Sequence, residues 1–325
     1  NYAEIVVPGA ALTTAVQISD AGKILGNYFD SSGLHPFIID NGTYTPLSVP
    51  GATSTIIRTS YSVGGSIPAV INDADQVIGT YVDATGSYSF LYSDGSYTTL
   101  AVPAAISTTV TQINNAGQVL GIYNATSDGT SSSTLSFVYS DGTYTPIAVP
   151  GATSTIAFQI NDAGQVAGTY SDQTGSHVFL DNSGAYVTIS PPSSPPPSGS
   201  GPSTPSAFFT QLTNAGDVLG YYFGSGGPSF SGSQPFLYSD GTSTNASVPG
   251  ATTTNTIRIN DQGQLIGSFS DGVTSNAFLA TPIRADVMQA ALLADPLPAV
   301  PDASAFVVPN PDSTNTGSSV LLPYL

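Results

Sequence analysis

Six imperfect copies of one segment run through the chain, and this repetition constrains the fold more than any other feature. Each copy has a strand-like start, a short turn related to Asn-Asp-Ala-Gly, and a second strand ending in Gly-x-Tyr or Gly-x-Phe. The copies are Val16–Tyr28, Val70–Tyr81, Gln112–Tyr123, Gln159–Tyr170, Gln211–Tyr222 and Arg258–Phe269. Equivalent positions are spaced from 42 residues (Ile71 to Ile113) to 53 residues (Ile18 to Ile71). This spacing is typical of β-propeller blades.

Each copy continues into further strands. A third strand begins near a phenylalanine in all six copies, at Phe37, Phe90, Phe137, Phe179, Phe236 and Phe278, and five copies carry a fourth strand. Asn41-Gly42 and Asp94-Gly95 separate third from fourth strands, and such dipeptides favour type I′ hairpins. Each repeat is therefore predicted to be a four-stranded antiparallel meander. The glycine at the centre of each second strand is expected to make room for an aromatic ring of the next blade or for a close backbone approach.

The two ends of the repeat region predict how the fold closes. The sixth copy stops after Phe278–Ile283 without a fourth strand, and the chain begins with Glu4-Ile-Val-Val-Pro-Gly9, which matches the end of such a strand. We predict an all-β fold in which residues 1–283 form a six-bladed β-propeller. The N-terminal strand, residues 2–8, is expected to complete blade six and remove long exposed edges. Residues 284–325 are predicted to be a C-terminal extension with a short helix (Asp286–Ala294).

Charge restricts the partners of the chain. The formal net charge is −17, with only four Lys and Arg residues. Nucleic-acid binding needs clustered cations, so we predict no nucleic-acid partner. The same balance disfavours anionic lipid. No apolar run approaches the ~20 residues that span a bilayer, so no membrane insertion is expected. The start at Asn1, without Met, is typical of a processed, secreted protein.

The third-strand starts resemble a known group of repeats. They read His35-Pro-Phe37, His177-Val-Phe179 and Asn276-Ala-Phe278, and they accompany segments such as Ile160-Asn-Asp-Ala-Gly-Gln-Val166. Over about residues 1–283 the chain resembles the bacterial extracellular HAF-repeat family. The resemblance implies an exported bacterial protein. It implies no activity, and no functional residues carry over from it.

Sequence motifs of catalysis are missing from the chain. Both histidines stand at repeat-equivalent strand starts, and no nucleophile elbow, P-loop or zinc-binding spacing occurs. Most of the twenty Asp fall at turn positions, where backbone capping explains them. We therefore predict no catalytic residues, no cofactor and no enzymatic activity. A carboxylate pair for glycoside hydrolysis is the open alternative.

Four recurring aspartates raise the question of a metal. Asp30, Asp83, Asp172 and Asp271 each lie two residues beyond a Gly-x-Tyr or Gly-x-Phe strand end. Calcium prefers several such oxygens at one point, but these four belong to separate blades and lack the Asp-x-Asp-x-Asp-Gly loop. No metal site is predicted, and a structural calcium ion at these residues is the alternative.

Insertions gather at the connections that would share one face of the propeller, and such a face commonly binds ligands. Its Tyr, Asn, Asp and Ser residues suit sugar hydroxyls, although the chain has no Trp to stack on a sugar. The predicted glycan-binding residues on this variable face are Tyr222, Phe223, Ser229, Gln234, Asn124 and Asp128.

Two apolar segments predict assembly. Phe306-Val-Val-Pro309 resembles Ile5-Val-Val-Pro8, and Val320–Leu325 is a further apolar stretch. A strand added to the sheet edge of another copy would build a filament or ring. Folding back onto the same propeller is the alternative. The predicted assembly residues are Ile5, Val6, Val7, Phe306, Val307, Val308, Leu322 and Tyr324.

These observations favour a non-enzymatic secreted scaffold or adhesion protein that assembles with itself into an extracellular filament by strand exchange. The alternative is a lectin-like propeller that binds an extracellular glycan on its variable face. The expected partners are accordingly further copies of the chain or a glycan.

Overall fold

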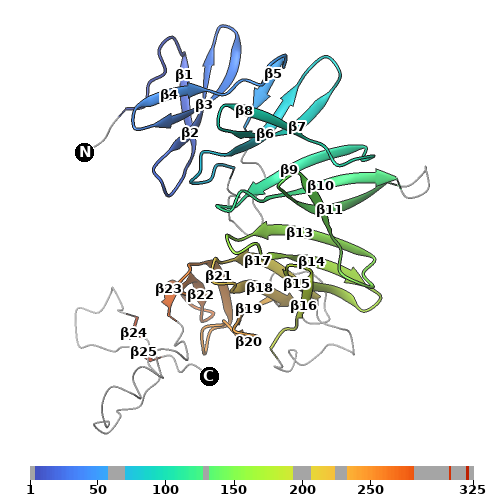
Figure 1. Cartoon of the computed structure of the whole chain (residues 1–325). Helices are drawn as coiled ribbons and strands as arrows, with labels where there is room; N and C mark the ends of the chain where they lie inside the picture. Colours follow the sequence, from blue (N-terminus) through green and yellow to red (C-terminus); the bar gives the residue numbers. More distant parts are fainter. Residues whose placement is uncertain are drawn as a thin grey trace, which may run out of the picture. The chain divides into compact units, whose positions relative to one another are not determined.

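The computed structural model describes residues 4–57, 70–126, 132–192, 206–223, 233–281, 307–308 and 320–321. In these ranges the chain is built from β-strands (Figure 1). Sheet 1 contains β1 (Leu12–Ile18), β2 (Ile24–Asp30), β3 (Gly33–Asp40) and β4 (Thr43–Pro46). Sheet 2 contains β5 (Ser54–Ile56), β6 (Val77–Val82), β7 (Ser87–Ser93) and β8 (Ser96–Leu100). Sheet 3 contains β9 (Ser107–Ile113), β10 (Val119–Thr126), β11 (Ser132–Ser140) and β12 (Thr143–Ile147).

The later sheets follow the same order. Sheet 4 contains β13 (Ser154–Ile160), β14 (Val166–Asp172), β15 (Gly175–Asn182) and β16 (Ala185–Ile189). Sheet 5 contains β17 (Ser206–Leu212), β18 (Val218–Phe223), β19 (Ser233–Ser239) and β20 (Thr242–Asn245). Sheet 6 contains β21 (Thr253–Ile259), β22 (Leu265–Ser270) and β23 (Ser275–Ala280). The predicted repeated antiparallel sheets are confirmed, and within the described ranges sheet 6 has three strands.

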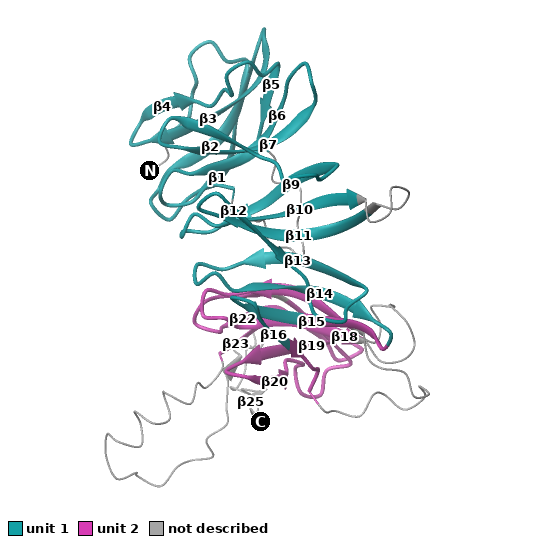
Figure 2. Ribbon diagram, turned by 45° about the vertical axis from the view of Figure 1, so that its right-hand side comes forward, with its two compact units in different colours: residues 1–173, 179–187 teal, residues 174–178, 188–325 magenta. Residues whose placement is uncertain are grey.

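The chain divides into two units (Figure 2). Unit 1 comprises residues 1–173 and 179–187, and therefore sheets 1 to 3 and most of sheet 4. Unit 2 comprises residues 174–178 and 188–325, and therefore sheets 5 and 6. Closure of six blades into one ring, with the N-terminal strand completing blade six, stays a prediction.

Turn chemistry explains how the strands reverse. Asn41 and Gly42 have φ of 47° and 80°, and Asp94 and Gly95 have φ of 50° and 79°. Positive φ at both central residues defines the type I′ hairpin, so the predicted turns are confirmed. The expectation for the central glycines is confirmed in one part and wrong in the other. The close backbone approach is present: a Cβ at Gly26 would lie 2.7 Å from the carbonyl oxygen of Thr14, and one at Gly168 would come still closer to that of Ile156. The ring beside Gly26 does not come from the next blade, because the Cβ would lie 2.5 Å from Cζ of Phe37, on the neighbouring strand of its own sheet.

Apolar side chains fill the space between successive sheets inside each unit. In unit 1, Leu25 and Ile38 of sheet 1 pack in one buried cluster with Ile71 and Val77 of sheet 2. Unit 2 has its own cluster, in which Leu219 and Leu237 of sheet 5 join residues of sheet 6, including Ile259, Leu265 and Phe278. Both faces of an inner sheet are therefore apolar, as expected for sheets that are covered on both sides.

Glutamine and asparagine side chains near the ends of the first strands form bridges from one sheet to the next. Gln112 of sheet 3 donates through Nε2 to the carbonyl of Ile160 at 2.9 Å and accepts from its N–H at 3.0 Å. Gln211 of sheet 5 makes the same pair of bonds to Ile259, at 2.7 and 3.0 Å. Asn114 Nδ2 donates to the carbonyl of Asn161 at 2.8 Å. Buried backbone groups are thereby paired, so these polar residues are structural.

Tyrosines of the fourth strands make a second set of bridges. The hydroxyl of Tyr97 in β8 accepts the N–H of Ser48, which follows β4, at 2.8 Å. Tyr144 accepts from Ala101 at 2.9 Å, and Tyr186 accepts from Ala148 at 3.0 Å. Successive sheets of unit 1 are thus joined by hydrogen bonds near their first and fourth strands.

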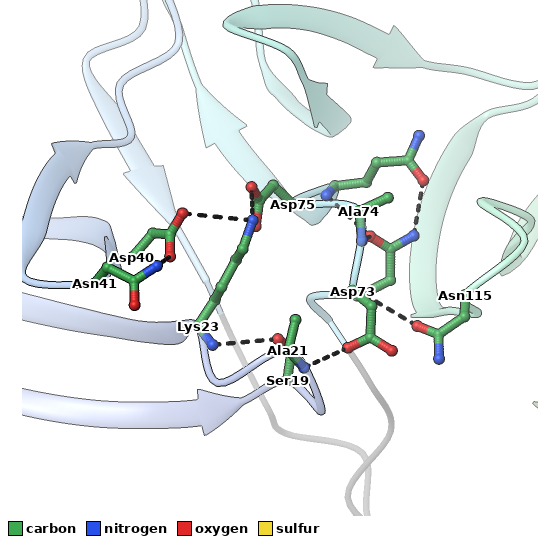
Figure 3. A network of polar contacts seen from close by, with 11 residues as sticks. Ser19, Ala21, Lys23, Asp40, Asn41, Asp73, Ala74, Asp75 and Asn115 are labelled. Atoms are coloured by element: carbon green, nitrogen blue, oxygen red, sulfur yellow. Dashed lines mark hydrogen bonds and ion pairs between the residues drawn. The ribbon is translucent and has the colours of Figure 1, made fainter.

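Sheets 1 and 2 are joined in addition by an ion pair (Figure 3). Lys23 Nζ donates to Asp75 Oδ2 and lies 3.7 Å from Asp40 Oδ2, with 17% of its side chain exposed. Asp75 has φ of 62°, at a turn position that is glycine in the other repeats. Between sheets 2 and 3, Gln76 and Gly117 occupy the equivalent positions, and a Cβ at Gly117 would lie 2.7 Å from Gln76 Oε1. Compared with the Gln76–Gly117 contact, the contact between sheets 1 and 2 therefore has lysine in place of glutamine and aspartate in place of glycine.

The N-terminal segment keeps the turn that ends each fourth strand. The N–H of Ala10 bonds the carbonyl of Val7 at 3.1 Å, as Ala52 bonds Val49 and Ala152 bonds Val149. Val7 is buried, and residues 4–7 are assigned to no strand. Residues 5–8 thus enter β1 in the same way that the end of a fourth strand enters the following sheet.

Candidate functional site

Within the described ranges, the hairpin tip of sheet 1 brings several reactive side chains together. At the β2–β3 turn, Asp30 Oδ1 accepts the N–H of Ser32 at 2.7 Å, its hydroxyl at 2.6 Å and the N–H of Gly33 at 3.2 Å. His35 Nε2 lies 2.8 Å from the Ser32 hydroxyl and 3.2 Å from Asp30 Oδ1. The His35 ring lies 5.0 Å from that of Tyr28. A carboxylate, a hydroxyl and two rings are thus held together at the molecular surface.

The same arrangement recurs at other tips. In sheet 2, Asp83 Oδ1 accepts from the N–H and the hydroxyl of Thr85 at 2.7 and 2.6 Å, and the Thr85 hydroxyl lies 2.9 Å from that of Tyr88. In sheet 4, the Thr174 hydroxyl lies 2.9 Å from His177 Nε2. In sheet 6, Asp271 Oδ1 accepts the N–H of Thr274 at 2.7 Å, and Asn276 donates to the Thr274 hydroxyl at 3.2 Å.

Hydrogen bonding keeps these carboxyl groups ionised. The Ser32 hydroxyl and N–H lower the pKa of Asp30, and the Thr85 hydroxyl and N–H lower the pKa of Asp83. Backbone N–H groups of Thr274 and Val273 lower the pKa of Asp271. Burial, together with the neighbouring Tyr28, raises the pKa of Tyr44 beside the first tip. The tips therefore present carboxylates at neutral pH, and Tyr44 beside the first tip keeps a neutral phenol.

These turn bonds account for the recurrence of aspartate that suggested calcium. Asp30, Asp83 and Asp271 each cap their own hairpin, and they belong to three different sheets. Within the described ranges, no three His, Cys, Asp or Glu side chains come together as metal ligands would. Asp172, at the equivalent position of sheet 4, also engages in protein contacts.

The Ser32–His35–Asp30 cluster differs from a nucleophilic triad. A triad places serine on one imidazole nitrogen and aspartate on the other. Here both groups face Nε2, and the Ser32 hydroxyl donates directly to Asp30. The cluster can offer hydrogen-bond donors and acceptors to a ligand. Sequence reasoning missed it because Ser32 is unremarkable alone; the Asp-x-Ser/Thr-Gly spacing before a His or Tyr was the available signal.

The predicted glycan residues are mostly engaged within their own sheets. Tyr222 in β18 is buried and donates to Gln234, its cross-strand partner in β19, at 2.7 Å. Asn124 in β10 donates to Ser107 at 2.9 Å and accepts from Thr134 at 2.8 Å. Tyr222 and Asn124 belong to different sheets and different units. Phe223 is the last residue of β18, while Ser229 and Asp128 lie outside the described residues.

The predicted assembly residues fall into two groups. Val6 is exposed, Val7 is buried and Ile5 is intermediate. At the other end, β24 (Val307–Val308) pairs antiparallel with β25 (Val320–Leu321) of the same chain. Phe306, Leu322, Tyr324 and the predicted helix Asp286–Ala294 lie outside the described residues. The two C-terminal apolar segments thus pair with each other.

Sheet 6 leaves apolar residues uncovered at positions that the preceding sheets bury. Ile266 and Leu279 are cross-strand partners and are 46% and 43% exposed. Their equivalents are buried in sheet 1 (Leu25 and Ile38) and in sheet 5 (Leu219 and Leu237). In sheet 1, Ile18 is 65% exposed, whereas its equivalents Ile71, Ile113, Ile160, Leu212 and Ile259 are all buried. Among the described residues, apolar side chains are therefore left exposed on a face of sheet 1 in unit 1 and on a face of sheet 6 in unit 2.

Comparison with known proteins identifies the architecture and no family. No family model and no curated protein matches the chain, so the HAF resemblance stays a prediction. Three solved structures of similar fold are dipeptidyl peptidase 4 of Porphyromonas gingivalis, acylaminoacyl peptidase of Pyrococcus horikoshii and the lectin of Aleuria aurantia, a six-bladed β-propeller. The first is 9% identical with a TM-score of 0.50, covering 83% of this chain and 44% of that chain. The second is 9% identical, with a TM-score of 0.46 and coverages of 83% and 45%. The lectin is 12% identical, with a TM-score of 0.31 and coverages of 79% and 86%.

These matches correct the prediction that the chain is not an enzyme. This chain spans less than half the length of the two peptidases. The peptidase of Porphyromonas gingivalis contains a sheet array of similar fold, so the missing catalytic motifs did not justify that prediction. At such low identity the likeness shows the fold alone. Within the described ranges, no helix is long and apolar enough to cross a membrane.

Proposed function

We propose that the chain is an extracellular adhesion protein that binds glycans through the hairpin tips between the second and third strands of its sheets. The observation that carries this proposal is the repeated tip of carboxylate, hydroxyl and ring, as at Asp30, Ser32 and His35. Ligand sites commonly combine an apolar surface with a few fixed polar groups. A sugar offers hydroxyls to the carboxylate and C–H groups to the rings.

Repetition of the tip suits a multivalent ligand. Sheets 1 and 2 each present a hydroxyl against a ring side chain, at Ser32–His35 and at Thr85–Tyr88. Individually weak sites gain strength when one polymeric ligand reaches several of them. A surface polysaccharide is therefore a better ligand than a free monosaccharide.

A glycan array probed with the full chain tests this proposal. Ser32→Ala with Thr85→Ala should weaken binding to the strongest hit, since both remove a tip hydroxyl. Thr43→Ala, in the opposite turn of sheet 1, is the matched control and should bind as the wild type does. An array without a hit, or equal loss with Thr43→Ala, would contradict the proposal.

A second candidate, a self-associating scaffold, is favoured by the uncovered faces. In each unit, apolar faces of adjoining sheets cover one another, so the half-exposed pair Ile266 and Leu279 calls for a similar cover. We propose that a first-sheet face bearing Ile18 provides it, and that residues 2–8 supply the fourth strand of sheet 6. Within one chain this closes the predicted six-bladed ring; between copies it extends a filament.

Light scattering after size-exclusion chromatography separates the two outcomes. A closed ring predicts a monomer that loses thermal stability when residues 1–7 are deleted. Strand exchange predicts oligomers that Ile266→Ser with Leu279→Ser dissociates. A chain cut after Pro301 tests the C-terminal contribution. A monomer whose stability is indifferent to the N-terminal deletion would contradict both arrangements.

A further inference from the structure

The sequence contains one Asn-Gly pair, Asn41-Gly42, and the pair forms the turn between β3 and β4 of sheet 1. Both residues are exposed, and a Cβ added to Gly42 would meet no atom within 4 Å. Glycine has no side chain that could shield its own backbone nitrogen from the residue before it. Neighbouring atoms therefore leave room for a reaction between the Asn41 side chain and the Gly42 nitrogen.

Equivalent turns of other sheets show that aspartate fits the position of Asn41. The φ of Asn41 is 47°. In sheets 2, 3 and 5 the same place is taken by aspartates with φ of 50°, 49° and 49°, namely Asp94, Asp141 and Asp240. Aspartate at position 41 is thus compatible with the type I′ hairpin, and loss of the side-chain amide would leave the fold intact.

The hydrogen bond beside this turn has its donor and acceptor exchanged relative to another sheet. Asn41 donates through Nδ2 to Asp40 Oδ1 at 2.8 Å (Figure 3). In sheet 3, by contrast, the Ser140 hydroxyl donates to Asp141 Oδ2 at 3.1 Å. Conversion of Asn41 to aspartate would remove the donor and place two carboxylates next to each other. Like charges at this distance repel each other, so the change would be felt by Asp40.

We propose that Asn41 is a site of spontaneous deamidation, which adds a negative charge next to the contact between sheets 1 and 2. The Gly42 nitrogen attacks Cγ of Asn41, the new N–Cγ bond closes a succinimide ring, and the Cγ–Nδ2 bond breaks. The proton of the Gly42 nitrogen leaves with Nδ2 as ammonia. Water then opens the ring at either carbonyl carbon, which gives aspartate or, with the chain running through Cγ, isoaspartate. Water is the only other reactant.

The hairpin limits the rate of this reaction. Ring closure takes the peptide between Asn41 and Gly42 out of the type I′ geometry, so the turn must open first. The turn is an exposed hairpin tip, and β4 beyond it has only four residues, Thr43–Pro46. Local opening at such a place costs little free energy compared with unfolding of the whole chain. Deamidation should therefore proceed in the folded chain and accelerate when the chain is unfolded.

The new charge would lie beside the ion pair that joins sheets 1 and 2. Asp40 Oδ2 lies 3.7 Å from Lys23 Nζ, which also donates to Asp75. The Asp40 side chain is 46% exposed, so it can turn away from a carboxylate at position 41. Its contact with Lys23 would then weaken, while that of Asp75 would remain. For exposed charges we expect the melting temperature to fall by only about 1 to 2 °C.

This inference is independent of the proposed functions. The β3–β4 turn lies at the opposite end of sheet 1 from the β2–β3 tip that is proposed to bind glycans. Failure of glycan binding or of self-association would leave the deamidation proposal standing, and the converse also holds.

Peptide mapping by mass spectrometry, after incubation of the full chain in mildly alkaline buffer, tests the proposal. Asn182 is the internal control, because it is exposed at the β15–β16 turn of sheet 4 but precedes Ser183 instead of a glycine. Asn41 should convert several-fold faster than Asn182 and should yield both aspartate and isoaspartate. Incubation in urea should accelerate the conversion of Asn41.

Two variants test the effect of the charge. Asn41→Asp should fold and should melt about 1 to 2 °C below the wild type. Asp40→Ser with Asn41→Asp recreates the pair seen at Ser140 and Asp141, so it should regain the melting temperature of the wild type. An Asn41 that stays intact in the folded chain, or that converts no faster than Asn182, would overturn the proposed site. An Asn41→Asp variant that melts with the wild type would overturn the proposed effect on the contact.

Discussion

The Lys23–Asp75 pair offers a quantitative test of how neighbouring sheets recognise each other. Lys23→Gln leaves the Asp75 carboxylate without its partner, and its Oδ1 is already shielded and unpaired. Asp75→Gly removes the ion pair, but it also removes the strain of a positive φ at a non-glycine residue, and this relief stabilises the fold by about 1 kcal/mol. The pair is partly exposed, so we expect each single change to destabilise by about 1 to 2 kcal/mol, less than a buried pair would cost.

The double variant should recover. Lys23→Gln with Asp75→Gly recreates the arrangement seen at Gln76 and Gly117, where glutamine lies over glycine. We expect its stability to fall within about 0.5 kcal/mol of the wild type, which gives a coupling energy of about 2 to 4 kcal/mol. Urea denaturation followed by tyrosine fluorescence measures it, since the chain has seventeen Tyr and no Trp. Additive losses would refute the idea that the two positions are exchanged as a unit.

The pH dependence of this coupling has a definite sign. The hydrogen bond and charge of Asp75 raise the pKa of Lys23. A group with a raised pKa in the folded state contributes its stability fully below the unfolded value, near 10.4 for lysine, and loses it as pH rises through the folded value. The coupling should therefore be undiminished at pH 7 to 9 and should disappear in strong alkali.

Three more changes probe the repeat contacts. Gln112→Ala should lower the free energy of unfolding by about 2 to 3 kcal/mol in urea denaturation, because the buried N–H and carbonyl of Ile160 lose their hydrogen-bond partner. The control Thr145→Ala, at an exposed strand position, should change it by no more than about 0.5 kcal/mol. Gly26→Ala should cost about 2 kcal/mol, since its Cβ would meet Phe37 and the carbonyl of Thr14, and an unchanged denaturation midpoint would contradict this contact. Asp83 has a lowered pKa, so its contribution is present above pH about 3.8 and lost as pH falls through the folded value; Asp83→Asn should show a smaller drop in stability between pH 5 and pH 2 than the wild type.

Local signals predicted the fold well. Asn41-Gly42 and its equivalents specify their turns through backbone preference, and the period of the repeat sets the sheets. Sheet 6 has three strands within the described ranges, which agrees with the sixth repeat ending after its third strand. Each of these features is encoded within one repeat, so a single sequence suffices.

Contacts between repeats were less predictable. The Phe37 ring was assigned to the wrong sheet because its packing depends on side-chain direction, which spacing does not give. Tyr222 was expected to face a ligand, but cross-strand register places Gln234 beside it. The exposed side chains of Leu12, Phe29 and Leu34 in sheet 1 were not predicted to lie side by side. The three residues are separated in the sequence, and only the strand register brings them next to one another.

The bridges between sheets have a consequence for how such a chain can change during evolution. Gln112 and Gln211 each bond only backbone atoms of the next sheet, and every non-proline residue provides those atoms. A whole repeat could therefore be duplicated, deleted or moved, and the new neighbours would still find their partners. Lys23 and Asp75, by contrast, depend on each other's side-chain identity. This pair would therefore tie the first repeat to the second, because a rearrangement that separated the two repeats would leave the Asp75 carboxylate without its cation.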